Sequence, residues 1–209
     1  MRLAIPSHSA RTNQILLIAG QCWFCLSNPA VAKHLIVSVG SECYLTLPKG
    51  QIIPTGEYAE GRPGDITAIP GGGHVLIVPI MHYGTYSSIP TDDSPPIIDE
   101  TNKYKSAVRS MYAKHGCVPV AFEVSILSGK GGHSHIQIIP VPNRLKDRIE
   151  PAFMSEGQMS GIGFEEDPEA ALESCSGGKG NYFAVELPDG RKMVHLITQG
   201  VPFSLQFGR

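Results

Sequence analysis

The stretch GHSHIQIIP at residues 132–140 decides the fold class of this chain. Polar and apolar residues alternate along it, which is typical of a β-strand whose successive side chains point to opposite faces. We therefore expect His133, His135 and Gln137 to share one face of a strand, while the intervening isoleucines face the other side. Apolar packing has no use for two imidazoles and a carboxamide, so this face predicts a functional site.

The segments around this stretch predict several β-strands and one main helix. Two β-rich runs, 34–39 and 42–47, flank Gly40-Ser41, which is a two-residue hairpin signal. The helical periodicity of residues 97–115 predicts one main helix, with Asp99 or Thr101 as its cap. Further strands are expected at 74–80, 118–127 and 133–141. The apolar face of the helix would hold Ile98, Tyr104, Val108, Met111, Tyr112 and His115.

The last third of the chain predicts a C-terminal extension. Residues 165–174 are a short acidic helix candidate, and two β-rich runs, 181–187 and 192–197, flank the turn signal Pro188-Asp189-Gly190. The pattern leaves open whether this extension packs on the first unit as a lobe or begins a further domain.

Composition excludes several classes of protein. Of 209 residues, 42% are hydrophobic and 17% charged, which is ordinary for a globular chain. The net charge of −2 argues against a uniformly basic surface, so any RNA contact must come from a local patch. No apolar run is long enough to span a membrane, and the amino terminus does not resemble a secretory signal.

The cysteines indicate metal binding rather than a disulfide framework, because there are five of them in a chain without a secretory signal. Cys22 and Cys25 form a C-x-x-C pair that can chelate one ion, and zinc prefers four cysteine or histidine ligands. His82 and His133 would complete such a structural zinc site. His34 and His74 are alternative ligands, and a chance pair of cysteines in a turn is the simpler explanation. We expect Cys43 and Cys117 to be buried thiols.

The residues around His135 indicate phosphate chemistry. An imidazole held at one nitrogen can attack phosphorus with the other, and Gln137 can donate a hydrogen bond to a phosphate oxygen. The preceding glycine-rich turn offers backbone N–H groups, a hydroxyl and a lysine to an anion. A polar strand edge with solvated histidines is the alternative interpretation. The phosphate or RNA contacts expected here are Ser128, Lys130, Gly131, Gly132, Arg144, Lys146 and Arg148.

Several motifs together resemble the CwfJ C-terminal family. They are CWFCLSNP at 22–29, HLIVSV at 34–39, YLTLPKG at 44–50, HVLIVPIMHY at 74–83 and HSHIQIIPVP at 133–142. The resemblance covers most of residues 21–143. The segment 181–209, with NYF, LPDG and LQFGR, looks like a shortened form of the second conserved CwfJ region.

This resemblance implies a histidine-triad (HIT-like) α+β fold with an antiparallel sheet and one main helix. It also implies a nuclear role with the spliceosome or in intron-lariat debranching. By the same resemblance, Cys22, Cys25, His82 and His133 would bind zinc, while His135 would be the nucleophile. Gln137 stands where such a triad has its third histidine, which argues against efficient nucleotide hydrolysis. The loop at 48–73 is also longer than expected. The implied division is a lead at 1–20, either disordered or a short strand, a HIT-like zinc domain at 21–143, and the second region at 144–209.

Three hypotheses for the function follow. The first is an RNA-processing module that binds branched-intron or other single-stranded RNA, a lariat debranching enzyme, or spliceosome components. The second is an active nucleotidyl hydrolase or transferase with His135 as nucleophile. The third is an architectural zinc module that binds protein partners. In such proteins a metallophosphoesterase-like domain often precedes this region, so we expect the chain to be part of a longer protein.

Overall fold

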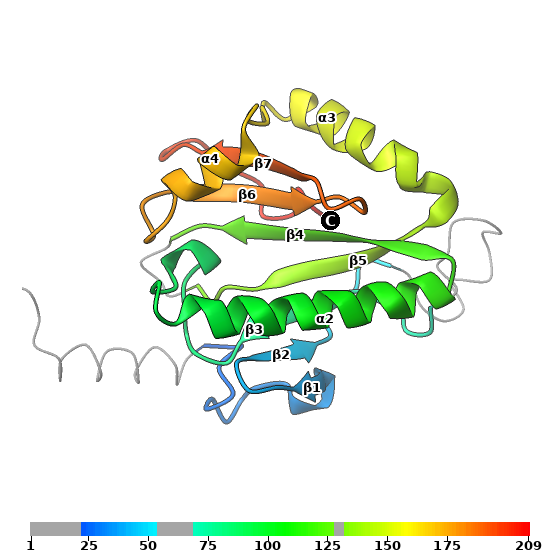
Figure 1. Ribbon diagram of the computed structural model, residues 1–209, viewed down its shortest axis with the longest axis vertical. Helices are drawn as coiled ribbons and strands as arrows, with labels where there is room; N and C mark the ends of the chain where they lie inside the picture. Colours follow the sequence, from blue (N-terminus) through cyan, green and yellow to red (C-terminus); the bar gives the residue numbers. More distant parts are fainter. Residues whose placement is uncertain (1–21, 54–68, 128–131) are drawn as a thin grey trace, which may run out of the picture.

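The computed structural model describes residues 22–53, 69–127 and 132–209, so the expected lead at 1–20 lies outside the described residues. One antiparallel sheet of seven strands, in the order β1-β2-β3-β5-β4-β6-β7, organises the chain (Figure 1). The predicted α+β class is therefore confirmed. The strands are β1 Ile36–Val39, β2 Cys43–Thr46, β3 Val75–Pro79, β4 Cys117–Ser125, β5 Ile136–Pro142, β6 Asn181–Glu186 and β7 Lys192–Ile197.

Strand β5 begins later than predicted. It starts at Ile136, so His133 and His135 lie in the segment just before the strand, and placing them within it was wrong. Strand β3 pairs with β5 only as far as Ile77, opposite Ile136. Continuing this register would set Ser134 against Pro79, which has no N–H to donate to the ladder. The two histidines therefore lie outside the strand ladder, and their side chains need not follow the alternation of a strand.

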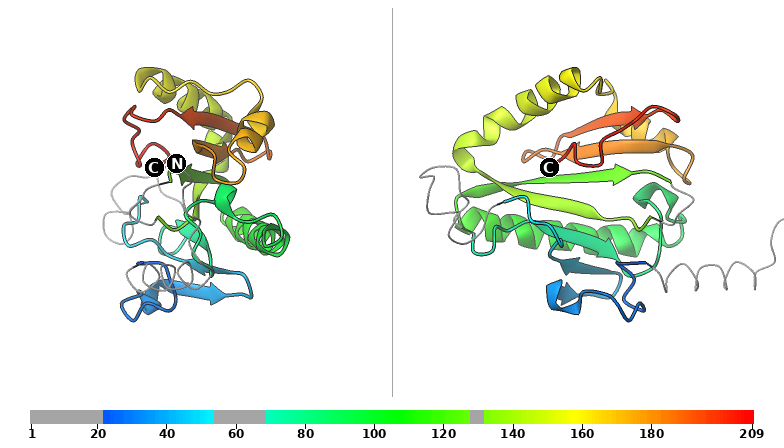
Figure 2. Two further views of the ribbon diagram at one scale, coloured as in Figure 1. Left: turned by 90° about the vertical axis from the view of Figure 1, so that its left-hand side faces the viewer. Right: turned by 180° about the vertical axis from the view of Figure 1, so that it is seen from behind.

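The main helix, α2 (Ser94–Lys114), lies across one face of the sheet (Figures 1 and 2). It begins three residues before the predicted start, and neither Asp99 nor Thr101 caps it. A proline in the first turn is tolerated because the N–H groups there have no partner within the helix. The buried face is formed by Ile97, Thr101, Val108 and Tyr112, and the predicted Ile98 is 39% exposed instead.

The first core lies between α2 and the sheet. Ile77, Ile136 and Ile138 pack there with Tyr112, whose hydroxyl donates to the backbone oxygen of Ile138 at 3.1 Å. The predicted burial of the Cys43 and Cys117 thiols is confirmed. Both are free and nearly inaccessible.

The second core covers the opposite face of the sheet. Helix α3 (Ile149–Met159) and the C-terminal tail pack here, and phenylalanine rings from β4, β6 and the tail meet in this core. The tail crosses this face of the sheet in the rear view of Figure 2.

Helix α4 (Pro168–Ser174) confirms the predicted acidic helix and packs on β7 and β6. Short 3-10 helices are η1 (Lys33–Leu35), η3 (Tyr86–Ser88) and η4 (Asn143–Arg148).

The predicted C-terminal hairpin is present as β6 and β7. Strand β6 pairs with β4 along five residues, from Ala121 opposite Glu186 to Ser125 opposite Tyr182, so the hairpin extends the same sheet. No helix in the described ranges is long and apolar enough to cross a membrane.

Candidate functional site

The structure brings together the four predicted metal ligands. The Sγ of Cys22 lies 3.3 Å from His133 Nδ1, and the Sγ of Cys25 lies 3.2 Å from His82 Nδ1 and 3.6 Å from His133 Nδ1. All four donor atoms lie within 4.8 Å of one another. A tetrahedral zinc ion with ordinary bond lengths would hold sulfur and nitrogen ligands roughly 3.5 Å apart. The donor set and its spacing therefore fit such an ion.

Hydrogen bonds around the quartet orient its ligands. His133 Nε2 lies 2.8 Å from the carbonyl oxygen of Pro79, which can only accept, so this nitrogen is the protonated one. Nδ1 therefore presents its lone pair to the cysteines, as in the carboxylate- or carbonyl-supported histidines of metal sites. Burial lowers the pKa of His133 to about 4, which keeps the ring neutral. Burial and the neighbouring Cys22 raise the pKa of Cys25 to about 12, so stable thiolates here call for a cation.

Neither alternative ligand belongs to this quartet. His34 lies exposed in η1, and His74 is buried at the start of β3, where its Nε2 lies 3.2 Å from Gln137 Oε1. The arrangement thus selects between the ligand sets that the sequence left open.

A pocket of about 600 Å³ lies beside the quartet, on the face of the sheet opposite α2. His133, His135 and Gln137 all line it, so the three polar residues of the opening motif do converge on one site. Much of the remaining wall is apolar, with Phe24 and Leu76 among its residues. Among the described residues that line it, none is aspartate or glutamate. Such a pocket suits a ligand with an apolar body and negative charge.

His135 is held in an orientation that leaves one nitrogen free. Its Nδ1 lies 2.9 Å from the carbonyl oxygen of His133, so Nδ1 carries the proton and Nε2 keeps its lone pair. Phe24 stacks on the ring, with centroids 5.0 Å apart and planes 29° from parallel. Burial lowers the pKa of His135, which favours the neutral imidazole.

Gln137 has a partner that the sequence reasoning did not assign. The Nε2–H of the buried His74 points to Gln137 Oε1, and this contact turns the amide N–H₂ of Gln137 away from His74. Burial lowers the pKa of His74 to about 4, so the ring is neutral. His74 therefore orients the side-chain amide of Gln137. The HVLIVP run, which begins with a histidine on an apolar strand, is the only sequence signal that pointed to it.

The predicted anion contacts fall into three groups. Gly132 lines the pocket, whereas Ser128, Lys130 and Gly131 lie outside the described residues. The basic residues on η4, which are Arg144, Lys146 and Arg148, are exposed and do not line the pocket. Strand β5 separates them from Gln137 by about 20 Å, given a rise of roughly 3.3 Å per strand residue.

The pocket also contains residues that the sequence did not assign to the site. Trp23 lies between the two cysteines, Lys49 follows β2, and Arg209 belongs to the tail. These residues are far apart in the sequence, so no local pattern indicates that they lie close together. All three lie within the family motifs CWFCLSNP, YLTLPKG and LQFGR, but these motifs did not indicate a role for them at the site.

Comparison with known proteins assigns the chain to a family. The family described as "Protein similar to CwfJ C-terminal" matches residues 9–154. The chain belongs to the CwfJ C-terminal family. CWF19-like protein mug161 of Schizosaccharomyces pombe is 38% identical over 190 residues, covering 91% of this chain and 31% of that protein. Human CWF19-like protein 1 is 36% identical over 191 residues, covering 90% of this chain and 30% of that protein.

A plant member has a name that mentions zinc. Zinc finger CCCH domain-containing protein 59 of Oryza sativa is 30% identical over 200 residues, covering 92% of this chain and 29% of that protein. The chain thus spans about a third of the length of the curated CwfJ relatives it matches.

Solved structures resemble the chain more distantly. A hypothetical histidine triad nucleotide-binding protein from Sulfolobus tokodaii is 15% identical, with a TM-score of 0.34 over 52% of this chain and 60% of that chain. A GALT-like protein from Arabidopsis thaliana is 12% identical, with a TM-score of 0.44 over 88% of this chain and 84% of that chain.

Proposed function

We propose that this CwfJ C-terminal region is an RNA-processing module whose pocket binds a phosphate of single-stranded or branched RNA. Its family membership supports a splicing-related role, because the relatives are CWF19-like proteins. Under this proposal the chain acts in the nucleus, with spliceosome components or a lariat debranching enzyme as partners. The observation that carries the proposal is the pocket itself, where His135 and Gln137 face an apolar wall without any acidic lining residue in the described parts.

The proposed metal is a structural zinc ion. Cys22, Cys25, His82 and His133 would hold it, and four protein ligands leave no position open for a substrate. When bound, the ion would cross-link three segments of the chain, which are the segment after residue 21, the segment that follows β3 and the segment before β5. It would thereby fix His133, whose backbone oxygen accepts the hydrogen bond from His135.

Titration calorimetry with adenosine 5′-monophosphate and a short single-stranded RNA would test the pocket. We expect His135→Ala and Gln137→Ala each to weaken binding about tenfold, since a hydrogen bond to a charged group is worth about 1.5–3 kcal/mol. Lys114→Gln removes an exposed charge from the end of α2 and serves as the control. Wild-type affinity in both pocket variants would contradict the proposal.

Nucleotidyl transfer is a second candidate function, favoured by the free Nε2 of His135. In this reaction the Nε2 lone pair would attack an α-phosphorus, and the bond from phosphorus to the leaving oxygen would break. Water would then supply the hydroxyl that cleaves the P–N bond and the proton that restores the leaving group. Mass spectrometry after acid-free denaturation should detect a nucleotidyl adduct that His135→Ala abolishes. Absence of an adduct with mononucleotide, dinucleotide and capped-RNA substrates would leave a binding site only.

The basic residues of η4 form a proposed second contact for longer RNA. Because they lie about 20 Å from Gln137, charge reversal of Arg144, Lys146 and Arg148 should weaken binding of a long oligonucleotide and leave a dinucleotide unaffected. The loss should shrink as salt is raised, since phosphate contacts release counterions. Equal binding of the long oligonucleotide by the wild type and the reversed variant would eliminate this contact.

A further inference from the structure

The rim of the pocket contains two cations from distant parts of the chain. The guanidinium of Arg209 donates to the carbonyl oxygen of Gly50 and, at 3.0 Å, to Oε1 of Gln206. Next to Gly50, Lys49 places its Nζ 3.7 Å from the centroid of the Trp23 ring. All five residues line the pocket, so the C-terminal tail and the segment after β2 form one continuous rim.

The tail holds Arg209 at this rim through the second core. The ring of Phe207 meets that of Phe183 edge to face, with centroids 5.1 Å apart. Gly208 is buried, and a Cβ there would lie 2.4 Å from a ring carbon of Phe122. Glycine permits this close approach, so the backbone just before Arg209 packs directly against the second core.

Among the described residues, no carboxylate forms an ion pair with the charges at the rim, which are those of Lys49 and Arg209. Their contacts with described residues are with neutral groups, namely the Trp23 ring and two amide oxygens. Unpaired cations at the mouth of a cavity attract anions, and an arginine fork can grip two phosphate oxygens.

We propose that Arg209 and Lys49 form a second phosphate subsite, so that the pocket prefers a phosphodiester-linked oligonucleotide to a nucleoside monophosphate. This inference rests on the proposed function, in which the first phosphate lies at His135 and Gln137. Trp23 decides between an oligonucleotide and a simple diphosphate. Its ring is 69% exposed beside Lys49 and offers a second base a stacking surface.

Calorimetry with three adenine ligands tests the subsite on the zinc-loaded chain. The ligands are AMP with one phosphate, ADP with two on one nucleoside, and the dinucleotide pApA. The wild type should bind pApA about tenfold more tightly than AMP, as expected for one added charge-assisted contact. Arg209→Gln and Lys49→Gln should each remove most of that preference and keep AMP affinity within about twofold. Trp23→Ala should weaken pApA alone, and the control Lys114→Gln should change nothing.

Each contrary result has its own meaning. If AMP and pApA bind equally to the wild type, or if Arg209→Gln and Lys49→Gln are both silent, the second subsite is refuted while the proposed function stands. If ADP binds as tightly as pApA and Trp23→Ala is silent, the oligonucleotide assignment is overturned in favour of a polyphosphate. If neither AMP nor pApA binds, the proposed function itself fails. Circular dichroism of each variant checks folding, and Arg209 and Lys49 are both exposed, so their replacement removes no core contact.

Discussion

At the residue scale, the two histidines of the GHSH motif differ in which nitrogen is available. His133 donates from Nε2 to Pro79 and offers Nδ1 to the cysteines, whereas His135 donates from Nδ1 and keeps Nε2 free. Backbone carbonyls make this assignment in both cases, because they can only accept. Both side chains line the pocket, but which nitrogen each makes available depends on the carbonyl oxygens of Pro79 and of His133 itself.

Replacing Cys22 should show that the cysteines of the quartet differ in function from the buried thiols outside it. We expect Cys22→Ser to lower the zinc content well below one ion per chain and to destabilise the fold by several kcal/mol, since metal binding is coupled to folding. Elemental analysis and chemical unfolding would measure both quantities. The matched control is Cys117→Ser, a buried thiol outside the quartet, which should keep its zinc. Full metal content in Cys22→Ser would exclude the proposed ligand set.

The quartet could be predicted from the sequence because cysteine and histidine are themselves the residue types that bind zinc. Cysteine pairs and histidines near strand ends are rare enough to be noticed at a distance. Lys49 and Arg209 are ordinary surface residues by type, and only the folded chain sets them beside the pocket. The basic residues of η4 do not line the pocket, because strand β5 separates them from Gln137, and their role as RNA contacts remains a prediction.

At the scale of elements, strands were easier to predict than helix ends. β-rich, alternating or continuously apolar runs indicated all seven strands, whereas the early start of α2 depends on Pro95 and Pro96, which fit a first helical turn. Helix α3 was not predicted, because Pro151 and Gly157 weaken its pattern. Gly157 is required there by packing, as a Cβ would lie 2.9 Å from the backbone oxygen of Ile162.

Glu100 on α2 anchors the β1–β2 hairpin. Its carboxylate accepts hydrogen bonds from the backbone N–H groups of Ser41, Glu42 and Cys43 at 3.0, 2.6 and 2.5 Å. These contacts hold the pKa of Glu100 below its usual value although burial opposes them. Glu100→Ala should cost about 1–2 kcal/mol of unfolding free energy in urea titrations. The exposed Asp99→Ala on the same helix is the control, and an equal loss there would refute the anchor.

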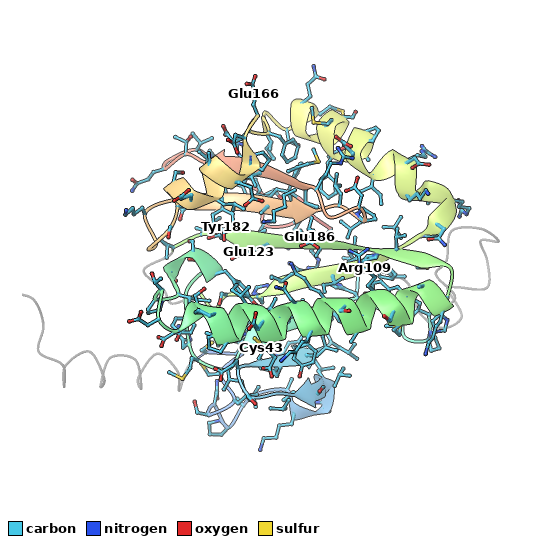
Figure 3. All side chains as sticks on the ribbon, viewed as in Figure 1. Cys43, Arg109, Glu123, Glu166, Tyr182 and Glu186 are labelled. Carbon is cyan, nitrogen blue, oxygen red and sulfur yellow. The ribbon has the colours of Figure 1, made fainter. Side chains whose placement is uncertain are left out.

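Glu123 on β4 should make stability depend on pH. It accepts from the Tyr86 N–H at 3.1 Å and from the Tyr182 hydroxyl at 2.8 Å, and burial raises its pKa from 4.5 to about 7 (Figure 3). The folded state therefore binds this proton more tightly than the unfolded state does. The resulting stabilisation is complete below pH 4.5 and is lost as pH rises to about 7, by roughly 3 kcal/mol.

Urea unfolding at pH 5 and pH 7.5 would measure this effect in the wild type and in Glu123→Gln. The glutamine can accept from Tyr86 and donate to Tyr182, so the variant should lose the pH dependence and keep the fold. Comparing the two proteins isolates Glu123, because other titrating groups, including the histidines of the quartet, are common to both. An identical pH dependence in the two proteins would show that Glu123 is not the responsible group.

At the scale of the whole molecule, the C-terminal hairpin is tied to α2 as well as to β4. Lys105 on the helix pairs with Glu186 on β6 at 2.6 Å, and Arg109 donates to the Pro188 carbonyl at 2.7 Å (Figure 3). Nothing local in the sequence connects these segments. The division of the chain into two regions at residue 143 remains a prediction. The strength of these two contacts would show how firmly the regions are joined.

A double-mutant cycle with Lys105→Met and Glu186→Gln should give a coupling energy of about 0.5–1 kcal/mol, because both side chains are only 24% exposed. The pair of Lys192 and Glu169 is the matched control. Its side chains are 37% and 74% exposed, and its coupling should be close to zero. Equal couplings in the two cycles would mean that the link between α2 and the hairpin adds nothing beyond an exposed pair.

The CWFC knuckle has a consequence for how the molecule responds to its surroundings. Trp23 and Phe24, which both line the pocket, lie between Cys22 and Cys25 in the chain. An ion that fixes the cysteines also fixes these rings, so metal and nucleic acid should each tighten the binding of the other by the same factor. Competition with a chelator, run with and without oligonucleotide, would measure that factor. Zinc supply would then set the RNA affinity of the protein in the cell.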